Sequence, residues 1–404
     1  MDTHETDGSA AATPAIDWSE IRARYPVASR SVFLNITSGT PLSHAARAAV
    51  QHLVDAQWEG RGVREDKQRL MASCRQRFAQ LIGAQSAEIA VTKNVTEGLN
   101  IVASAIDWQP GDNVVFCQEL EHPNNIYLWL ELKRRGVEIR TPPPRHGAID
   151  TQAMIDAIDA RTRLLTVASV TFTPGFRSEL AALGRACRKV GALFLVDAVQ
   201  SCGILAMDVE ACAIDALATS TSKGLMGMPG LGFLYVRSDW IERLHPVYVG
   251  RYSVERGKGH ESEIEGASYA LLADARRFEA GNYNWAGIAA AEASLGELLA
   301  VGTENIEPRV VALASALADG LETLDLAVSR PPETVARSHI VTVGELGAGD
   351  AHSSHDPRLN RIGAALQEGG VKYTVRKGML RFGFHCYNNE SDVARVIEIA
   401  RSVA

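Results

Sequence analysis

The chain has 404 residues with a formal net charge of −7, 46% apolar and 22% charged residues, so we expect a globular enzyme with two domains sharing a cleft. The acidic balance, without any Lys/Arg run, disfavours nucleic-acid binding. No apolar segment approaches the ~18 residues of a membrane span, and residues 1–15 are typical of a disordered tail, unlike a secretory signal.

Six cysteines are scattered through the chain without a CxxC pair. This pattern favours reduced, mostly buried thiols in a cytoplasmic protein over disulfides or a metal site. His352 and His355 lie close in sequence, but no third ligand accompanies them, so we predict no bound metal.

Two helices are predicted early in the chain. Ser43 caps an apolar pattern of helical period over 44–58, and a second helix over 64–81 ends at Gly83, which suits a left-handed terminus. The polar joint between them, residues 59–64, is either a plain helix–helix turn or a loop facing the substrate. Residues 16–30 are expected to join the small C-terminal domain.

From Glu88 onward, short β-type runs alternate with helical patterns, which favours a mostly parallel sheet covered by helices. The seven expected strands are 89–92, 113–117, 137–140, 163–169, 192–197, 213–219 and 231–237. We therefore predict an α/β fold with a large domain over 31–290.

The remaining residues, 291–404, predict a small α+β domain. Its expected helices lie at 289–299, 307–324, 358–368 and 391–403, and its strands at 339–343, 372–375 and 379–383. The first helix begins inside the large domain and connects the two.

An acid and a lysine follow two of the predicted strands. The run 194–197 ends at Asp197, and the run 214–219 leads to Lys223. Because the carboxyl ends of strands in an open α/β sheet face one crevice, both side chains can meet one ligand. The pair suits pyridoxal 5'-phosphate, which needs a lysine for its covalent link and an acid to keep its ring nitrogen protonated. A structural salt bridge of Asp197 and an exposed Lys223 are the alternatives.

Phosphate binding requires hydrogen-bond donors and the start of a helix. Strand 89–92, a polar turn and a helix from about Val95 provide them, with Thr96 offering its hydroxyl and its backbone N–H. Ser220 and Ser222 would complete the cradle. Thr96 is equally compatible with an ordinary helix cap.

Two further residues are placed to contact the cofactor ring. Gln200, three residues after Asp197, can donate a hydrogen bond to the ring hydroxyl. His122 follows strand 113–117, and its flat imidazole can stack on the ring and assist proton transfer. A helix-capping or core histidine is the alternative for His122.

Seven sequence blocks occur in the order NVTEGLN (94–100), EHPNN (121–125), SVTFTPGFR (169–177), VDAVQ (196–200), STSK (220–223), RFEAGN (277–282) and LRFGFHCYN (380–388). Together they resemble the class V aminotransferase family of fold-type I pyridoxal-phosphate enzymes, the group of cysteine desulfurases and isopenicillin-N-epimerase-like proteins. The resemblance runs from about Phe33 to Val403.

The resemblance implies a role for each matched position. Lys223 would form the covalent link, with Asp197 on the ring nitrogen, Gln200 on the ring hydroxyl and His122 stacked on the ring. Phosphate ligands would be Val95, Thr96, Ser220 and Ser222, joined by Asn282 from the partner subunit of a homodimer with shared active sites. Arg381 would clamp the carboxylate of a small amino-acid substrate, a role that suits its planar fork.

The chain also departs from the family pattern. Cysteine desulfurases carry a nucleophilic cysteine on a loop before the strand that holds the arginine, whereas only residues 376–379 fill that interval here. Cys386 follows the arginine and is no replacement. Thr171 stands where relatives often have Asn or Gln near the ring hydroxyl.

A desulfurase-like frame without the cysteine loop favours a lyase that cleaves the carbon–sulfur bond of a cysteine-derived amino acid by β-elimination, with Lys223 removing the α-proton. Transamination, epimerisation and decarboxylation-coupled oxidative deamination compete, because positioning alone decides which bond breaks. A non-catalytic cofactor-binding regulatory module is the alternative from another class. Residues 37–40 are expected at the entrance to the site.

Overall fold

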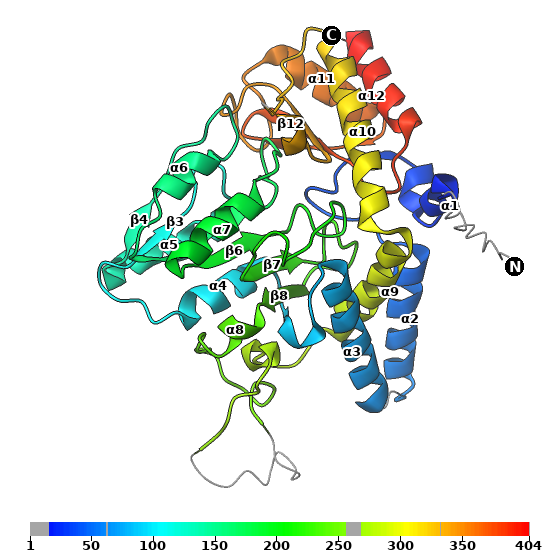
Figure 1. Cartoon of the computed structure of the whole chain (residues 1–404). Coiled ribbons are helices and arrows are strands. Elements are labelled where there is room, and N and C mark those ends of the chain that lie inside the picture. Colours follow the sequence, from blue (N-terminus) through cyan, green and yellow to red (C-terminus); the bar gives the residue numbers. More distant parts are fainter. Residues whose placement is uncertain (1–15, 62–63, 256–267, 332, 404) are drawn as a thin grey trace, which may run out of the picture.

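The computed structural model describes residues 16–61, 64–255, 268–331 and 333–403. The tail expected at 1–15 and residues 62–63 of the 59–64 joint lie outside the described residues. Helix α2 (His44–Trp58) and helix α3 (Arg64–Leu81) have the predicted bounds. Both pack against α9 (Trp285–Val301), and the three helices lie together at one side of the molecule (Figure 1).

A seven-stranded sheet forms the larger part, which confirms the predicted α/β fold. Its strand order is β2-β8-β7-β6-β5-β3-β4, and only β8 runs antiparallel to its neighbours. The strands are β2 (Ile89–Thr92), β3 (Asn113–Val115), β4 (Glu138–Arg140), β5 (Thr162–Ala168), β6 (Leu193–Asp197), β7 (Ala216–Ser220) and β8 (Gly232–Val236). Strand β7 begins three residues later than predicted because Ala213 adopts a left-handed conformation, with φ of 55°.

Helices cover both faces of this sheet. Phe194 and Val196 of β6 join one cluster of buried side chains, while Leu193 and Leu195 join another, as the two-residue period of a strand requires. Leu183 belongs to the first cluster. The covering helices are α4 (Val95–Ala105), α5 (Tyr127–Glu131), α6 (Thr151–Asp156), α7 (Leu180–Val190) and α8 (Ser238–Ile241).

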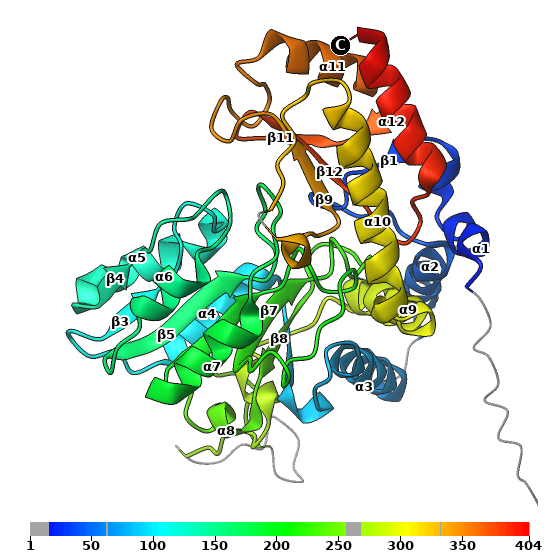
Figure 2. The same ribbon diagram turned by 45° about the horizontal axis from the view of Figure 1, so that its top comes forward.

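The second part of the molecule is built on a three-stranded antiparallel sheet (Figure 2). Its strands are β9 (Ile340–Val343), β11 (Thr374–Arg376) and β12 (Met379–Gly383), in the order β11-β12-β9. Helices α10 (Thr303–Glu322), α11 (Pro357–Glu368) and α12 (Glu390–Val403) flank it. No helix in the described ranges is both long and apolar enough to cross a membrane.

The strand predicted at 372–375 is in fact two strands. β10 (Val371–Lys372) pairs in parallel with β1 (Val32–Phe33), whereas β11 pairs with β12, so the chain changes partners at Tyr373. Helix α1 (Trp18–Ala23) packs nearby, where Arg22 forms an ion pair with Asp392.

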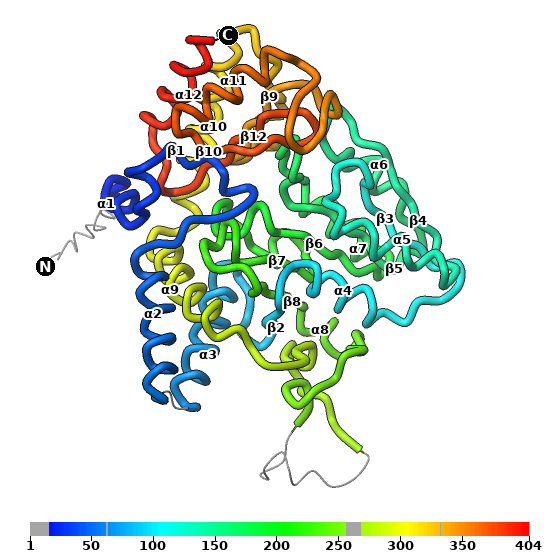
Figure 3. Tube along the Cα trace, turned by 180° about the vertical axis from the view of Figure 1, so that it is seen from behind, coloured from blue at the N-terminus to red at the C-terminus, as the bar shows by residue number. Residues whose placement is uncertain are grey.

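The segment after β1 crosses between the two sheets before it enters α2 (Figure 3). Leu34 accepts a backbone hydrogen bond from Gly383 of β12, and Thr37 accepts one from the Gln200 side chain. The N-terminal residues therefore connect the small sheet to the carboxyl ends of the large sheet.

Candidate active site

A cavity of about 50 Å³ lies at the carboxyl ends of β5, β6 and β7. Its lining residues are Val95, His122, Asn124, Ala168, Val170, Phe172, Asp197, Val199, Gln200 and Lys223. Five of the residues predicted from the sequence therefore share one cavity, here called the Lys223 cavity. The strands bring them together because parallel neighbours end at the same edge of a sheet.

Asp197 and Lys223 are the two charged groups that line this cavity. Asp197 is 7% exposed, and its Oδ1 accepts a hydrogen bond of 3.0 Å from the N–H of Val199. Burial raises the pKa of Asp197, and the charge of Lys223 opposes that rise. Burial lowers the pKa of Lys223 to about 8, although Asp197 acts in the opposite direction. About a tenth of the lysine is thus a neutral amine at pH 7, far more than for an exposed lysine.

The backbone next to Lys223 is tightly packed and hydrogen-bonded. A Cβ atom at Gly224 would collide with the carbonyl oxygen of Cys202, so no other residue fits there. His385 supports the same peptide: its Nδ1 accepts from the N–H of Cys386 at 2.7 Å, which leaves the proton on Nε2 to be donated to Gly224 O at 2.9 Å. His385 lies in the last of the seven blocks, but its contact with the lysine loop could not be inferred from sequence.

His122 lines the cavity and also caps a short 3₁₀ turn, which is the capping role considered as the alternative from the sequence. Its Nδ1 accepts from the N–H of Asn124 at 3.2 Å, and its ring meets Phe172 edge-on, with 5.3 Å between centroids. Burial, reinforced by the charges of Lys223 and two arginines, lowers the pKa of His122 to about 4. The imidazole is therefore neutral at physiological pH.

The neighbouring Glu121 was not singled out from the sequence. It is buried and accepts hydrogen bonds from the N–H of Ala168 at 2.7 Å and from Asn125 Nδ2 at 2.8 Å. These bonds fasten the His122 loop to the end of β5. Burial, with a further contribution from Asp197, raises the pKa of Glu121 to about 8.

The start of α4 offers an anion site next to the cavity. Ser220, at the end of β7, accepts a hydrogen bond of 2.9 Å from the N–H of Val95. The N–H of Thr96, in the same first turn, makes no hydrogen bond within the described ranges and is open to an external acceptor. Ser222 is partly exposed beside Lys223.

Six predicted residues do not line this cavity: Thr96, Ser220 and Ser222 next to it, Arg381 at its border, and Thr171 and Asn282. Thr171 is fully buried, and its hydroxyl accepts hydrogen bonds from the N–H groups of Gly175 and Phe176 at 3.1 Å each, which stabilises the turn that follows it. Its neighbours Val170 and Phe172 line the cavity. Asn282 is exposed elsewhere and accepts from Arg251 at 3.0 Å. A contact of Thr171 with the cofactor ring stays a prediction.

Arg381 of β12 is almost fully buried, with 2% of its surface exposed. It donates to Phe172 O at 2.5 Å, to Ser38 Oγ at 3.0 Å and to Thr374 Oγ1 at 3.2 Å. Burial lowers the pKa of Arg381 to about 9, with a smaller contribution from Arg376. Since Phe172 lines the Lys223 cavity, the small sheet contributes a cation at its border.

These groups fit pyridoxal 5'-phosphate. The buried Asp197 carboxylate has one hydrogen bond from the described residues, and a protonated ring nitrogen would supply a second donor and a charge. The open N–H of Thr96 and the Ser220 hydroxyl suit a phosphate. Lys223 faces the same cavity with a depressed pKa, as a covalent attachment point requires.

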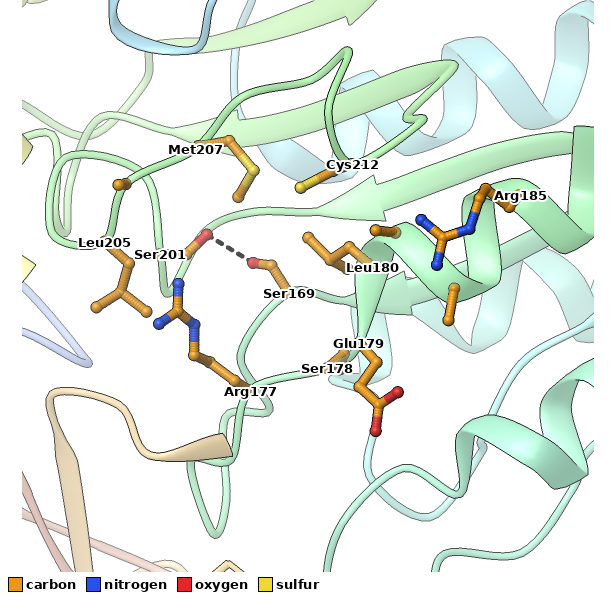
Figure 4. Close-up of a pocket in the computed structure, with 13 residues that line it drawn as sticks. Ser169, Arg177, Ser178, Glu179, Leu180, Arg185, Ser201, Leu205, Met207 and Cys212 are labelled. Carbon is orange, nitrogen blue, oxygen red and sulfur yellow. Dashed lines mark hydrogen bonds between the residues drawn. The ribbon is translucent and has the colours of Figure 1, made fainter. Parts of the chain in front are cut away.

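A second, more open cavity of about 370 Å³ lies beyond Ser169 and Ser201, whose hydroxyls are 2.6 Å apart (Figure 4). Arg177 on its wall pairs with Glu307 of α10. The cavity contains none of the predicted cofactor or substrate residues, so the chemistry is assigned to the Lys223 cavity. No group of three or more potential metal ligands gathers in the part of the chain that the structure describes.

The fold, together with the residues available to hold the cofactor, defines a fold-type I, pyridoxal-phosphate-dependent enzyme. The family model described as aminotransferase class-V matches residues 46–396, and the chain belongs to this family. A probable cysteine desulfurase of Methanothermobacter thermautotrophicus is 29% identical over 408 residues, covering 95% of this chain and 98% of the relative.

Two solved structures share the fold. The apo structure of a cysteine desulfurase from Thermococcus onnurineus NA1 superposes with a TM-score of 0.83 at 23% identity, covering 97% of this chain and 99% of the other. A complex of the cystine C–S lyase C-DES with its reaction product cysteine persulfide gives 0.81 at 22% identity, covering 93% and 99%.

Proposed function

We propose that this protein is a pyridoxal-phosphate-dependent C–S lyase that acts on a cysteine-derived amino acid by β-elimination. The observation that carries the proposal is the hairpin between β11 and β12. Its turn consists of Lys377 and Gly378, both with positive φ, between the paired residues Arg376 and Met379. A two-residue turn of this kind leaves no room for a loop with a nucleophilic cysteine.

The six cysteines give no substitute nucleophile. None lines the Lys223 cavity. Burial raises the pKa of Cys386 to about 12 and that of Cys117 to about 11, and the thiolate is the reactive form of cysteine. The relatives called cysteine desulfurases support a sulfur-containing substrate, whereas the missing nucleophile disfavours an enzyme-bound persulfide.

When bound, pyridoxal phosphate withdraws electrons from the substrate α-carbon and so weakens its bonds. Arg381 holds the α-carboxylate, which orients the α-proton towards Lys223. The Lys223 amine takes that proton, the Cβ–S bond breaks with its electron pair on sulfur, and the leaving thiolate takes up a proton. Addition of one water then gives thiol, pyruvate and ammonium, which balances the reaction. His122, neutral and packed on Phe172, shields the reacting face from water.

The remaining assignments are part of the same proposal. Asp197, Gln200 and His122 would contact the ring, and Val95, Thr96, Ser220 and Ser222 the phosphate. Asn282 would reach the phosphate of a partner subunit in a homodimer, which its exposure and its absence from the lining of its own subunit's cavity support. The proposal also includes a large domain over 31–290, a small domain over 291–404 and a cytoplasmic location.

The test uses a panel of S-substituted cysteines with the cofactor-loaded enzyme. We expect thiol and pyruvate in equal amounts, and a loss of about 10⁴-fold in rate for Lys223→Ala, because the general base is removed. Lys377→Ala, which removes a partly exposed lysine on the same hairpin that donates to Glu119 O, is the matched control and should retain the activity. Absence of thiol across the panel, or formation of alanine from cysteine through an enzyme persulfide, would contradict the proposal.

A further inference from the structure

We propose that Arg376 forms a second anion subsite, so that the preferred substrate carries a carboxylate on its sulfur substituent in addition to the α-carboxylate. This inference rests on the proposed lyase function and specifies its substrate class. It starts from the fact that two arginines, Arg376 and Arg381, converge on the hydroxyl of Ser38.

The hairpin places both arginines on one face. Thr374 of β11 pairs with Arg381 of β12, and Arg376 follows Thr374 by two residues, so its side chain points to the same face as theirs. Arg381 donates to Ser38 Oγ at 3.0 Å, and Arg376 Nη2 lies 3.4 Å from the same oxygen. The two guanidinium groups are thus diagonal neighbours at the border of the Lys223 cavity.

No protein carboxylate balances these charges. Within the described ranges, neither Arg376 nor Arg381 lies within ion-pair distance of an Asp or Glu, whereas Arg177 pairs with Glu307 and Arg22 with Asp392. Arg376 instead donates to its neighbouring carbonyl, Val375 O, at 2.6 Å. Two close cations without a counter-ion repel each other, and a ligand with two anionic groups relieves that repulsion.

The positive charge of Arg376 affects several other titratable groups of the site. Its charge contributes to the depressed pKa of Lys223, of His122 and of Arg381. It therefore acts on groups that line the cavity, and not only on the solvent side of the hairpin.

The two arginines differ in a way that separates their roles. Arg381 is buried and held by three hydrogen bonds, which suits the invariant α-carboxylate next to Lys223. Arg376 is half-exposed near the hairpin turn, where a substituent on sulfur would extend. A planar guanidinium fork favours a carboxylate over a neutral polar group.

The first test measures binding without turnover. The cofactor-loaded enzyme is titrated calorimetrically with 3,3'-thiodipropanoate, which has two carboxylates, and with 3-(propylthio)propanoate, which has one. We expect the first ligand to bind about 10- to 100-fold more tightly, and this ratio to fall to near 1 in Arg376→Met. The ratio should be unchanged in Lys377→Met, which removes the adjacent cation.

The second test compares kcat/KM for S-(2-carboxyethyl)cysteine and S-propylcysteine. A ratio above 10 in the wild type that collapses in Arg376→Met and Arg376→Gln supports the subsite. A ratio that survives both substitutions, or that falls equally in Lys377→Met, overturns it. If neither substrate releases thiol, the lyase proposal fails, while the binding ratio still decides the role of Arg376.

Discussion

The two sides of the Lys223 cavity are built in different ways. One side, the sheet wall, consists of Asp197, Gln200, Lys223 and His122 at or after the ends of strands in the large sheet. The other, the hairpin wall, consists of Arg376 and Arg381 on β11 and β12. The sheet wall sets its lysine in the field of a buried acid, whereas the hairpin wall presents two cations without a partner acid in the described residues.

This difference indicates that the two walls have separate roles in binding. A buried acid beside a lysine of lowered pKa suits a cofactor that stays in place through every turnover. Cations without a fixed counter-ion suit a ligand that arrives with its own charges and leaves. The comparison therefore predicts that substitutions in the sheet wall affect cofactor binding, and that substitutions in the hairpin wall affect substrate binding.

The largest expected effect on cofactor binding is that of Asp197→Asn. It leaves the shape unchanged but removes the charge that holds the ring nitrogen protonated, so we expect the cofactor affinity to fall at least about 30-fold and thiol release to fall with it. Equilibrium dialysis of the cofactor and rate measurements test this.

Asp215→Asn is the matched control for Asp197→Asn. Asp215 is also buried at the sheet, accepts from the N–H of Phe194 at 2.9 Å and pairs with Arg237 at 3.1 Å, away from the cavity. Its substitution should lower thermal stability and leave cofactor affinity within about twofold. Equal losses of cofactor affinity in both variants would remove the distinction between a cofactor contact and a structural carboxylate.

An intermediate effect is expected at the junction of the two walls. His385 follows β12 but donates to Gly224 O, so it couples the small sheet to the lysine loop. His385→Phe should lower kcat by about 10-fold, the equivalent of one hydrogen bond, with a smaller change in KM, since the residue does not line the cavity.

His385→Gln retains a donor on a side chain of similar reach and should recover part of the kcat that His385→Phe loses. The absorbance of the lysine–cofactor link against pH is a second measurement, because a displaced lysine would change it. A loss of folding stability with kcat unchanged in both variants would make His385 a purely structural residue.

The sheet wall was largely predictable from the sequence, whereas in the hairpin wall only Arg381 was singled out, and that through the family resemblance. Apolar runs that end in Asp197 and before Lys223 reveal strand ends, and strand ends in an α/β sheet converge by topology. The position of Thr171 in a matched block does not specify which of its neighbours lines the cavity; Val170 and Phe172 do. Arg376 was read only as part of a short interval, since its convergence with Arg381 depends on cross-strand register and on Ser38, more than 330 residues away in the chain. The contact of His385 with Gly224 was not predicted either, because it joins two segments that are far apart in the chain.

The smallest effect connects the two walls electrostatically. Lys223 must be neutral to capture the cofactor, and burial together with the charges of Arg381 and Arg376 lowers its pKa to about 8. The capture rate of cofactor-stripped protein should therefore rise with pH through about 8. Arg376→Met removes one positive charge, which favours the ammonium form, raises the pKa of Lys223 and moves the profile to higher pH. We expect capture about threefold slower at pH 7, measured by stopped-flow absorbance, whereas Lys377→Met should match the wild type. A profile that moves to lower pH would show that Arg376 does not act on Lys223 through its charge.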